Sequence, residues 1–328
     1  MSQSATFTHQ PVLAEPCIAL LGQGIKQVGS EGRALVIDAT LGLGGHSELI
    51  LQTYPQVHLV GIDRDKQALA NASKRLREYS KRFTAIHATY DAIDQVAAAY
   101  SNEEYPLAGV LMDLGVSSMQ LDDTARGFSY ARESDLDMRM DQSSGKTAAD
   151  LLAELPTAEL TEILRQWGEE RFASRIAREI VRTREKSPIT SSTQLVDIVR
   201  EAIPAPARRS GGNPAKRTFQ ALRIAVNQEL SILSDALPKA LQALAPGGVL
   251  VVEAYQSLED RIVKRAFQQA VAPAILEGIP LAEPKTFQLL INGAEKAPEA
   301  EVENNPRAAS VRLRAIRKLS AQAERNGE

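Results

Sequence analysis

The chain has 328 residues, of which 44% are hydrophobic and 24% are charged, and its formal net charge is −3. This length suffices for two domains, or for one domain that carries a large insertion. The net charge excludes a protein that binds nucleic acid over its whole surface, so any nucleic-acid site must be a local patch.

The same sequence limits where the protein is expected to work. Cys17 is the only cysteine, so an intrachain disulfide is impossible and a reducing compartment is expected. No apolar run approaches the ~20 residues of a membrane span, and the first residues lack the basic and apolar segments of a signal peptide. We therefore expect a cytoplasmic protein with no membrane segment. Because the four histidines are scattered and no cysteine pair exists, we expect no metal site.

The first third of the chain alternates predicted strands with predicted helices. Short apolar runs predict strands at 34–38, 57–63, 83–87 and 107–113. Apolar residues at helical spacing, or the gaps between these strands, predict helices at 47–52, 66–79 and 92–100. This order is typical of an α/β protein with a doubly wound parallel sheet.

The middle of the chain interrupts this alternation, because no strand is predicted between residues 122 and 226. Thr147 and Asp150 have the spacing of a capping box at the start of a helix. Further helices are predicted at 157–167, 171–186 and 193–203, and a long helix is predicted from near Ala215 to Leu233.

The α/β pattern then returns. Strands are predicted at 249–255, 285–291 and 311–317, and a helix capped by Ser257 and Asp260 is predicted at 258–270. We therefore predict an α/β domain formed by residues 1–121 and 227–328, into which an all-helical domain, residues 122–226, is inserted.

A glycine-containing segment, "DATLGLGGHS", follows the first predicted strand. It places Asp38 directly before a loop that contains Gly42, Gly44 and Gly45. A dinucleotide-binding fingerprint, G-x-G-x-x-G, requires a third glycine where this chain has Ser47. The loop therefore allows a ligand to approach the backbone closely, but it does not identify a phosphate site.

Asp38, Asp63 and Asp113 each end a predicted strand. The carboxyl ends of parallel strands share one edge of the sheet, which is where open α/β sheets bind ligands. Asp63 lies 25 residues after Asp38, close to the spacing expected of an acid that binds a ribose diol. The other two carboxylates suit a ligand with ammonium and sulfonium charges, and this favours S-adenosylmethionine over NAD. Helix capping is the alternative role for any one of these acids alone.

Five segments occur in order along the chain: "DATLGLGGHS", "GIDRD", "DLGVSSMQLDD", "RTFQALRIAVNQEL" and "SLEDRIVK". With "HQPVL" and "NPRAASVRLR" outside them, they resemble the bacterial small-subunit rRNA methyltransferase H family over nearly the whole chain. The resemblance implies a Rossmann-like class I methyltransferase fold, with S-adenosyl-L-methionine as cofactor. It also implies methylation of the N4 amine of a cytosine in the decoding region of 16S rRNA, within the small ribosomal subunit. Only the resemblance argues against DNA or protein as the methyl acceptor.

The resemblance also implies which residues bind the cofactor. They belong to the glycine loop and to the ribose, adenine and methionine positions, and they are Gly44, Gly45, His46, Asp63, Tyr90, Asp113 and Gln120. Asp38 and Gly42 join this set because of their place at the loop. Structural roles are the alternatives for two members: Tyr90 as a ring that covers the core, and His46 as a residue at a helix start.

The N4 amine of cytosine is a weak nucleophile because its lone pair is conjugated with the ring. An enzyme must align this amine with the methyl group and accept a hydrogen bond from it as charge develops. Many amino-methyltransferases have an Asn/Asp-Pro-Pro-aromatic tetrapeptide after the fourth strand. This chain has Asp113, Ser117 and Ser118 there instead, and these three are the candidate catalytic residues. Helix capping is the alternative role of the serines.

Methylation of cytosine at C5 would instead require a thiolate that adds to the ring. Cys17 lies far from the strand ends in the sequence, and we expect it to be buried in the core. This argues for amine chemistry.

A basic segment in the helical insertion predicts the RNA-binding site. The chain has no acidic residue between Ala202 and Gln228, where glycines form a loop that leads into a helix. Basic residues at a helix start are suited to bind phosphate groups. The candidates are Arg208, Arg209, Lys216 and Arg217, with Arg223, Arg126, Arg132 and Arg139 as further members of the same face. A solvated loop is the alternative.

Two positions depart from the family pattern, because Asn213 and Gln256 stand where many members have histidine. We expect both to orient or bind RNA rather than to transfer protons. The residues alone also leave two other functions open. An NAD-dependent oxidoreductase would need the missing third glycine, and a non-catalytic RNA-binding or assembly factor would not need the strand-end acids.

Overall fold

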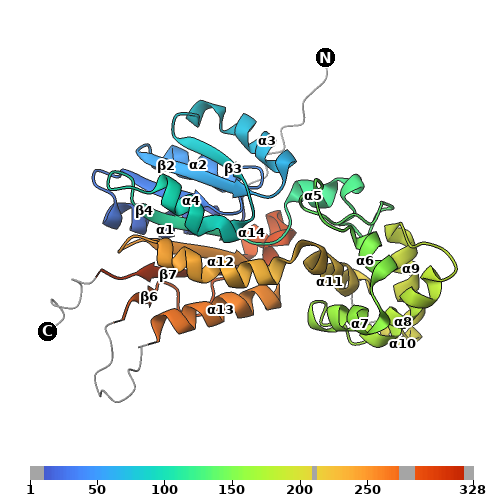
Figure 1. The fold of residues 1–328 in the computed structure, drawn as a ribbon. Coiled ribbons are helices and arrows are strands. Elements are labelled where there is room, and N and C mark those ends of the chain that lie inside the picture. Colours follow the sequence, from blue (N-terminus) through green and yellow to red (C-terminus); the bar gives the residue numbers. More distant parts are fainter. Residues whose placement is uncertain (1–10, 209–212, 273–284, 321–328) are drawn as a thin grey trace. The chain divides into compact units, whose positions relative to one another are not determined.

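The computed structural model describes residues 11–208, 213–272 and 285–320. The chain forms two compact units (Figure 1). The first unit comprises Met1–Gly115 and Ser231–Glu328, and the second comprises Val116–Leu230. The second unit therefore begins six residues before, and ends four residues after, the predicted insertion at 122–226.

The first unit contains a seven-stranded sheet in the order β3-β2-β1-β4-β5-β7-β6. Its strands are β1 (Ala34–Asp38), β2 (Val57–Asp63), β3 (Phe83–His87), β4 (Leu107–Asp113), β5 (Val249–Ala254), β6 (Phe287–Leu289) and β7 (Arg312–Lys318). β1 to β5 pair in parallel, whereas β7 is antiparallel to both β5 and β6. The chain reverses its direction across the sheet between β1 and β4, which makes a topological switch point. The predicted Rossmann-like α/β fold is confirmed.

Helices cover both faces of this sheet (Figure 1). They are α1 (Ala14–Val28), α2 (Gly45–Thr53), α3 (Lys66–Arg75), α4 (Ile93–Tyr100), α12 (Glu229–Ala243), α13 (Ser257–Val271) and α14 (Glu299–Asn304). One core joins α1, α2 and α3 to the sheet, and the other joins α4, α12 and α13 to it. Alternate residues of the central strands, such as Val36 and Ile37 of β1, belong to opposite cores. This accounts for the continuous apolar runs from which the strands were predicted.

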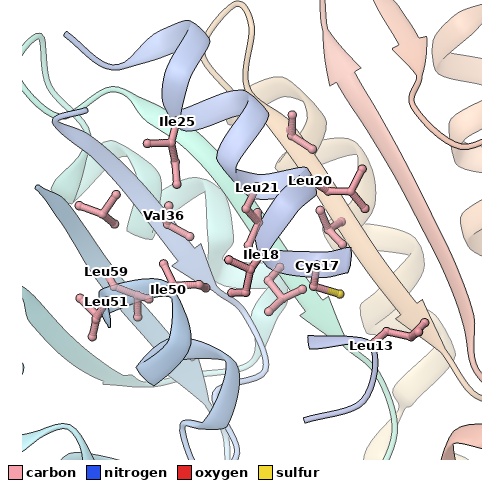
Figure 2. Packing of buried hydrophobic residues seen from close by; sticks show 14 of the residues in the cluster. Leu13, Cys17, Ile18, Leu20, Leu21, Ile25, Val36, Ile50, Leu51 and Leu59 are labelled. Carbon is pink, nitrogen blue, oxygen red and sulfur yellow. The ribbon is translucent and has the colours of Figure 1, made fainter. Parts of the chain in front are cut away.

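The sequence did not predict α1. Its buried side chains pack closely over the sheet, as Figure 2 shows for Cys17, Ile18, Leu21 and Ile25. A Cβ atom at Gly24 would lie 2.2 Å from the carbonyl oxygen of Ala108 on β4. The glycine therefore lets the helix backbone approach the strand closely, although it weakens helix propensity.

The start of α13 also differs from the prediction. Its N-cap is Gln256 rather than Ser257. The Glu259 carboxylate accepts hydrogen bonds from the backbone N–H groups of Tyr255 and Gln256, both at 3.1 Å.

The second unit is helical and has its own core. Its helices are α5 (Ser118–Asp122), α6 (Ala148–Glu154), α7 (Thr157–Gln166), α8 (Ala173–Arg184), α9 (Ser192–Ala202), α10 (Ala205–Arg208) and α11 (Lys216–Asn227). No strand occurs among the residues of this unit that the structure describes. The predicted capping box of Thr147 and Asp150 is present at the start of α6.

The long helix predicted from Ala215 to Leu233 is wrong as a single element. Gln228 has a φ of 52°, in the left-handed region, and it separates α11 from α12. Over the described parts of the chain, no helix has both the length and the apolar character of a membrane span.

Candidate active site

The glycine loop connects β1 to α2 in the first unit. Gly42 and Gly44 have φ angles of 51° and 75°, which a residue with a side chain adopts only with strain. At Gly45 a Cβ atom would lie 2.9 Å from Cγ of Pro11. The loop is therefore a compact turn at the start of α2, and its conformation and packing require glycine at these three positions.

Asp63, at the end of β2, fixes the glycine loop to the sheet edge. Its Oδ2 accepts a hydrogen bond from the Gly42 N–H at 2.8 Å, and its Oδ1 accepts one from the Asp65 N–H at 2.8 Å. Burial raises the pKa of the Asp63 carboxyl, and the two backbone hydrogen bonds oppose this rise. Each carboxylate oxygen still has a lone pair with which it can accept a further hydrogen bond.

Asp38, at the end of β1, is buried beneath this loop. Ser47 Oγ donates a hydrogen bond to its Oδ2 at 2.6 Å, and the Thr40 N–H donates one to its Oδ1 at 3.3 Å. Burial raises the pKa of the Asp38 carboxyl to about 6, against the effect of the Ser47 hydrogen bond. The position predicted for a third glycine thus holds a hydroxyl that binds Asp38.

Asp113 lies at the end of β4, next to β1 in the sheet. Its backbone N–H donates a hydrogen bond to Thr40 Oγ1 at 2.6 Å. Its side chain is 31% exposed, and it forms a hydrogen bond with the side chain of Tyr255. Burial, followed by the charge of Asp113, raises the pKa of the Tyr255 hydroxyl. The parallel sheet therefore brings all three predicted strand-end acids to one edge.

His46 lies on the first turn of α2 and is buried. Its Nδ1 is 3.8 Å from Asp113 Oδ2, and its Nε2 is 3.5 Å from Glu253 Oε2 and 3.1 Å from the carbonyl oxygen of Val12. Burial lowers the pKa of the imidazole, which favours its neutral form.

Glu253 and Tyr255 were missed by the sequence reasoning. The β4–β5 register pairs Glu253 directly with Asp113. A charged residue within the apolar run "VLVVEAY" was the available signal, because fully buried glutamate is rare unless it is paired.

Tyr90 opens a short 3₁₀ turn, Tyr90–Ala92, after β3, and its ring packs partly against the core that includes α4. Tyr90 thus lies in the loop that follows a strand of the same sheet. Its place beside the adenine stays a prediction.

The remaining candidate residues belong to the second unit. Ser117 is the N-cap of α5, and Ser118 begins this helix. Ser117 Oγ accepts the Gln120 N–H at 3.2 Å, and Gln120 Oε1 accepts the Ser117 N–H at 3.1 Å. These contacts form a capping box, so the structural alternative stated for Ser117 is present.

The basic candidates lie near the start of α11. Lys216 and Arg217 are exposed on its first turn, and Arg217 Nη1 donates a hydrogen bond to the carbonyl oxygen of Glu169 at 2.8 Å. Arg208 ends α10, whereas Arg209 lies outside the described residues. Asn213 Oδ1 accepts the Ala215 N–H at 2.9 Å, so this side chain helps to form the turn before α11.

Two further arginines do not belong to an exposed basic face. Arg126 is buried, and its Nη2 donates to the carbonyl oxygens of Arg139 and Met140 at 3.1 and 2.8 Å. Arg223 forms an ion pair with Glu229 at 2.9 Å. The prediction that they contribute to the same face is therefore wrong, because both stabilise the second unit internally.

Comparison with known proteins gives matches over nearly the whole chain. Residues 6–319 match the MraW methylase family. A Beutenbergia cavernae protein named ribosomal RNA small subunit methyltransferase H is 54% identical, with 96% of this chain and 94% of that protein covered. Proteins of the same name from Salinispora tropica and Mycobacterium avium are 53% and 51% identical, over 95% and 100% of this chain and 84% and 86% of theirs. The chain therefore belongs to the MraW methylase family.

Proposed function

We propose that the chain transfers a methyl group from S-adenosylmethionine to the N4 amine of a cytosine in the decoding region of 16S rRNA. Membership of the family makes it a methyltransferase with S-adenosylmethionine as cofactor. The observation that carries the choice of RNA is the name of its full-length relatives, which are small-subunit ribosomal RNA methyltransferases H. The base and the atom rest on the resemblance of the five ordered segments.

The residues at the sheet edge fit this cofactor. The glycine loop admits a ligand close to the backbone, and Asp63 has carboxylate lone pairs suited to a ribose diol. Asp38 and Asp113 add negative charge at the same edge, which favours a sulfonium and an ammonium over a pyrophosphate. In this proposal the remaining cofactor contacts are Gly42, Gly44, Gly45, His46, Tyr90 and Gln120.

Asp113 is the residue that we expect to act on the target amine. The cofactor supplies an activated methyl group when it is bound, so the protein must orient the amine and stabilise its developing positive charge. The backbone of Asp113 is fixed by Thr40, while its carboxylate remains partly exposed at the edge. Ser117 and Ser118 stay candidates for orienting the amine, although Ser117 Oγ already accepts one hydrogen bond.

Phosphate groups of the RNA are expected to bind the second unit. Lys216 and Arg217 expose positive charge at the first turn of α11, where the helix dipole adds to their attraction for anions. Arg208 and Arg209 precede them in the same segment. The substrate in this proposal is the assembled small ribosomal subunit.

The test is the transfer of tritiated methyl groups to small subunits from a strain that lacks this enzyme, followed by nucleoside analysis. We expect N4-methylcytosine from one position in the decoding region. A different methylated base, or label in DNA or protein alone, contradicts the proposal.

The variant Asp113→Ala tests the catalytic assignment in the same assay. We expect the rate of transfer to fall at least ~100-fold, as for other residues that stabilise developing charge. Asp235→Ala, which removes an exposed carboxylate from α12, is the matched control and should retain wild-type transfer. Near-wild-type turnover of Asp113→Ala would refute the assignment.

A further inference from the structure

Three side chains with metal-ligating atoms meet inside the first unit. Cys17 comes from α1, His46 from α2 and Glu253 from β5, and their ligating atoms all lie within 4.8 Å of one another. All three residues are buried. They are far apart in the sequence, so no spacing motif could reveal them.

Glu253 lacks the partners that a buried carboxylate normally has. Its side chain is fully buried, and no N–H or O–H group of the described residues donates a hydrogen bond to it; its polar neighbours are the Cys17 thiol and the His46 imidazole. Buried charges in proteins are paired or bind metals. A cation at this point would bind the carboxylate together with these two neighbours.

The imidazole of His46 separates this cluster from the predicted active site. Its Nε2 faces Glu253 and the Val12 carbonyl, at 3.5 and 3.1 Å, whereas its Nδ1 faces Asp113 at 3.8 Å. Since a carbonyl oxygen can only accept, Nε2 donates its proton to Val12 in this structure; a metal on Nε2 would displace that hydrogen bond and leave the proton on Nδ1, on the side of the Asp113 carboxylate. Metal-bound histidines usually donate their other ring nitrogen to a carboxylate, and here the Asp113 carboxylate would have to move closer than its present 3.8 Å to accept that hydrogen bond.

We propose that Cys17 Sγ, His46 Nε2 and the Glu253 carboxylate bind one zinc-class divalent ion. Thiolate, imidazole and carboxylate are the ligand types that Zn²⁺ prefers. Ligand atoms of a tetrahedral zinc site lie roughly 3.5 Å apart, a separation that His46 and Glu253 already have. The Cys17 side chain has to approach them slightly.

Charge balance supports the same ion. Binding removes one proton from the Cys17 thiol and one from the Glu253 carboxyl, so the dication and its two anionic ligands form a neutral group. The site is enclosed by protein and supplies three ligands, one fewer than a tetrahedral structural zinc site usually has. The ion joins α1 and α2 to β5 and holds His46 in the tautomer that faces Asp113.

The test uses the full chain purified without chelators. We expect about one equivalent of zinc by mass spectrometry of the metal. After removal of the metal, addition of Co²⁺ should produce a near-ultraviolet thiolate-to-cobalt absorption band. Competition with a chelating dye then gives the affinity for Zn²⁺ without any dependence on methyl transfer.

Glu253→Gln and Cys17→Ser are the test variants, and Glu104→Gln, on an exposed loop, is the control. We expect both test variants to lose at least ~10-fold in zinc affinity, and Cys17→Ser to lose the cobalt band, while the control matches the wild type. Glu253→Gln keeps the side-chain shape and replaces a buried carboxyl group by a neutral amide, so it should remain folded. Zn²⁺ should raise the melting temperature of the wild type but not that of Glu253→Gln.

A neutral cluster, in which Glu253 is protonated and binds no ion, gives a different result. In that case the wild type takes up no zinc in the dye competition and shows no cobalt band. This outcome, or equal zinc affinity of the wild type and Glu253→Gln, overturns the proposal and leaves the proposed function untouched.

Discussion

Ser47 binds and stabilises the buried carboxylate of Asp38, which lies beside the glycine loop. Its hydroxyl is fully buried and donates to Asp38 at 2.6 Å. Without this donor, Asp38 would keep only the longer hydrogen bond from the Thr40 N–H. Ser47 stands where the dinucleotide fingerprint has its third glycine, and its hydroxyl is required here because it binds the buried carboxylate of Asp38. The fingerprint has no such acid.

Ser47→Ala should destabilise the first unit by about 1–3 kcal/mol, the usual cost of an unsatisfied buried group. Urea unfolding followed by far-ultraviolet circular dichroism measures this loss. The control is Ser80→Ala, at an exposed position beyond α3, and it should change the free energy of unfolding by less than ~0.5 kcal/mol. Equal stability of the two variants would contradict the role given to Ser47.

The sequence predicted the strand-end acids because each closes an apolar run, and parallel strands bring such ends together. It did not predict that His46 lies between Asp113 and Glu253. That contact depends on the register of β4 with β5 and on the angle at which α2 leaves the glycine loop. Neither quantity is encoded in a local pattern.

Among the elements, α1 and the break after α11 were the main failures of the sequence reasoning. Gly22 and Gly24 lower the helix propensity of α1, whereas Pro16 lies in its first turn, where proline is tolerated. Yet a Cβ at Gly22 would lie 1.9 Å from the Tyr54 hydroxyl, so this glycine is needed for packing. Tertiary contacts outweigh local propensity here, and the apolar spacing of Cys17, Ile18, Leu21 and Ile25 was the signal that remained.

An ion pair between Asp137 and Arg139 helps to stabilise the segment between α5 and α6. Asp137 accepts hydrogen bonds from the backbone N–H of Arg139 at 3.0 Å and from its Nε and Nη2 at 2.8 and 2.9 Å. Burial acts to raise the pKa of Asp137, but the hydrogen bonds of Arg139 outweigh it and hold this pKa below its usual value.

Asp137→Asn should therefore lower the stability of the second unit at pH 7 but not in acid. A carboxyl with a lowered folded pKa stabilises the protein above its unfolded pKa, near 3.8, and this contribution is lost as the pH falls below about 4. The single tryptophan, Trp167, lies beside the core of this unit, so its fluorescence during urea unfolding at pH 7 and pH 3 is the measurement.

The difference in stability between wild type and Asp137→Asn should shrink from pH 7 to pH 3. Asp197→Asn removes the same charge at an exposed site of α9, 3.8 Å from Arg200, and should leave the stability nearly unchanged at both values. A constant difference for Asp137→Asn would show that the ion pair with Arg139 does not determine the acid sensitivity.

At the scale of the whole molecule, the chain is one α/β unit whose sequence is divided by a helical unit. The prediction of an insertion depended on the absence of strand patterns over a hundred residues, which is a robust signal. Its boundaries were less accurate, because Ser117, Gln120 and the first turn of α12 carry no pattern that distinguishes one unit from the other.

The two units share no hydrophobic core, and this predicts two unfolding transitions. Calorimetry should record heat absorption from both units, whereas Trp167 fluorescence should follow only the second. We expect the midpoint temperature seen by fluorescence to coincide with that of one of two calorimetric components. Excess S-adenosylmethionine should raise the midpoint temperature of the other component. A single transition seen identically by both methods would contradict independent units.

Strand β5 pairs with β4 on one side and with the antiparallel strand β7, which ends at Lys318, on the other. It therefore lacks one of its two neighbours until β7 has been synthesised. The helical unit, by contrast, is complete once Leu230 has been synthesised. During translation, the helical unit can therefore fold while the sheet of the first unit still lacks β5, β6 and β7. The helical unit can therefore complete its fold before the sheet, whose strands flank it in the sequence, has all of its strands.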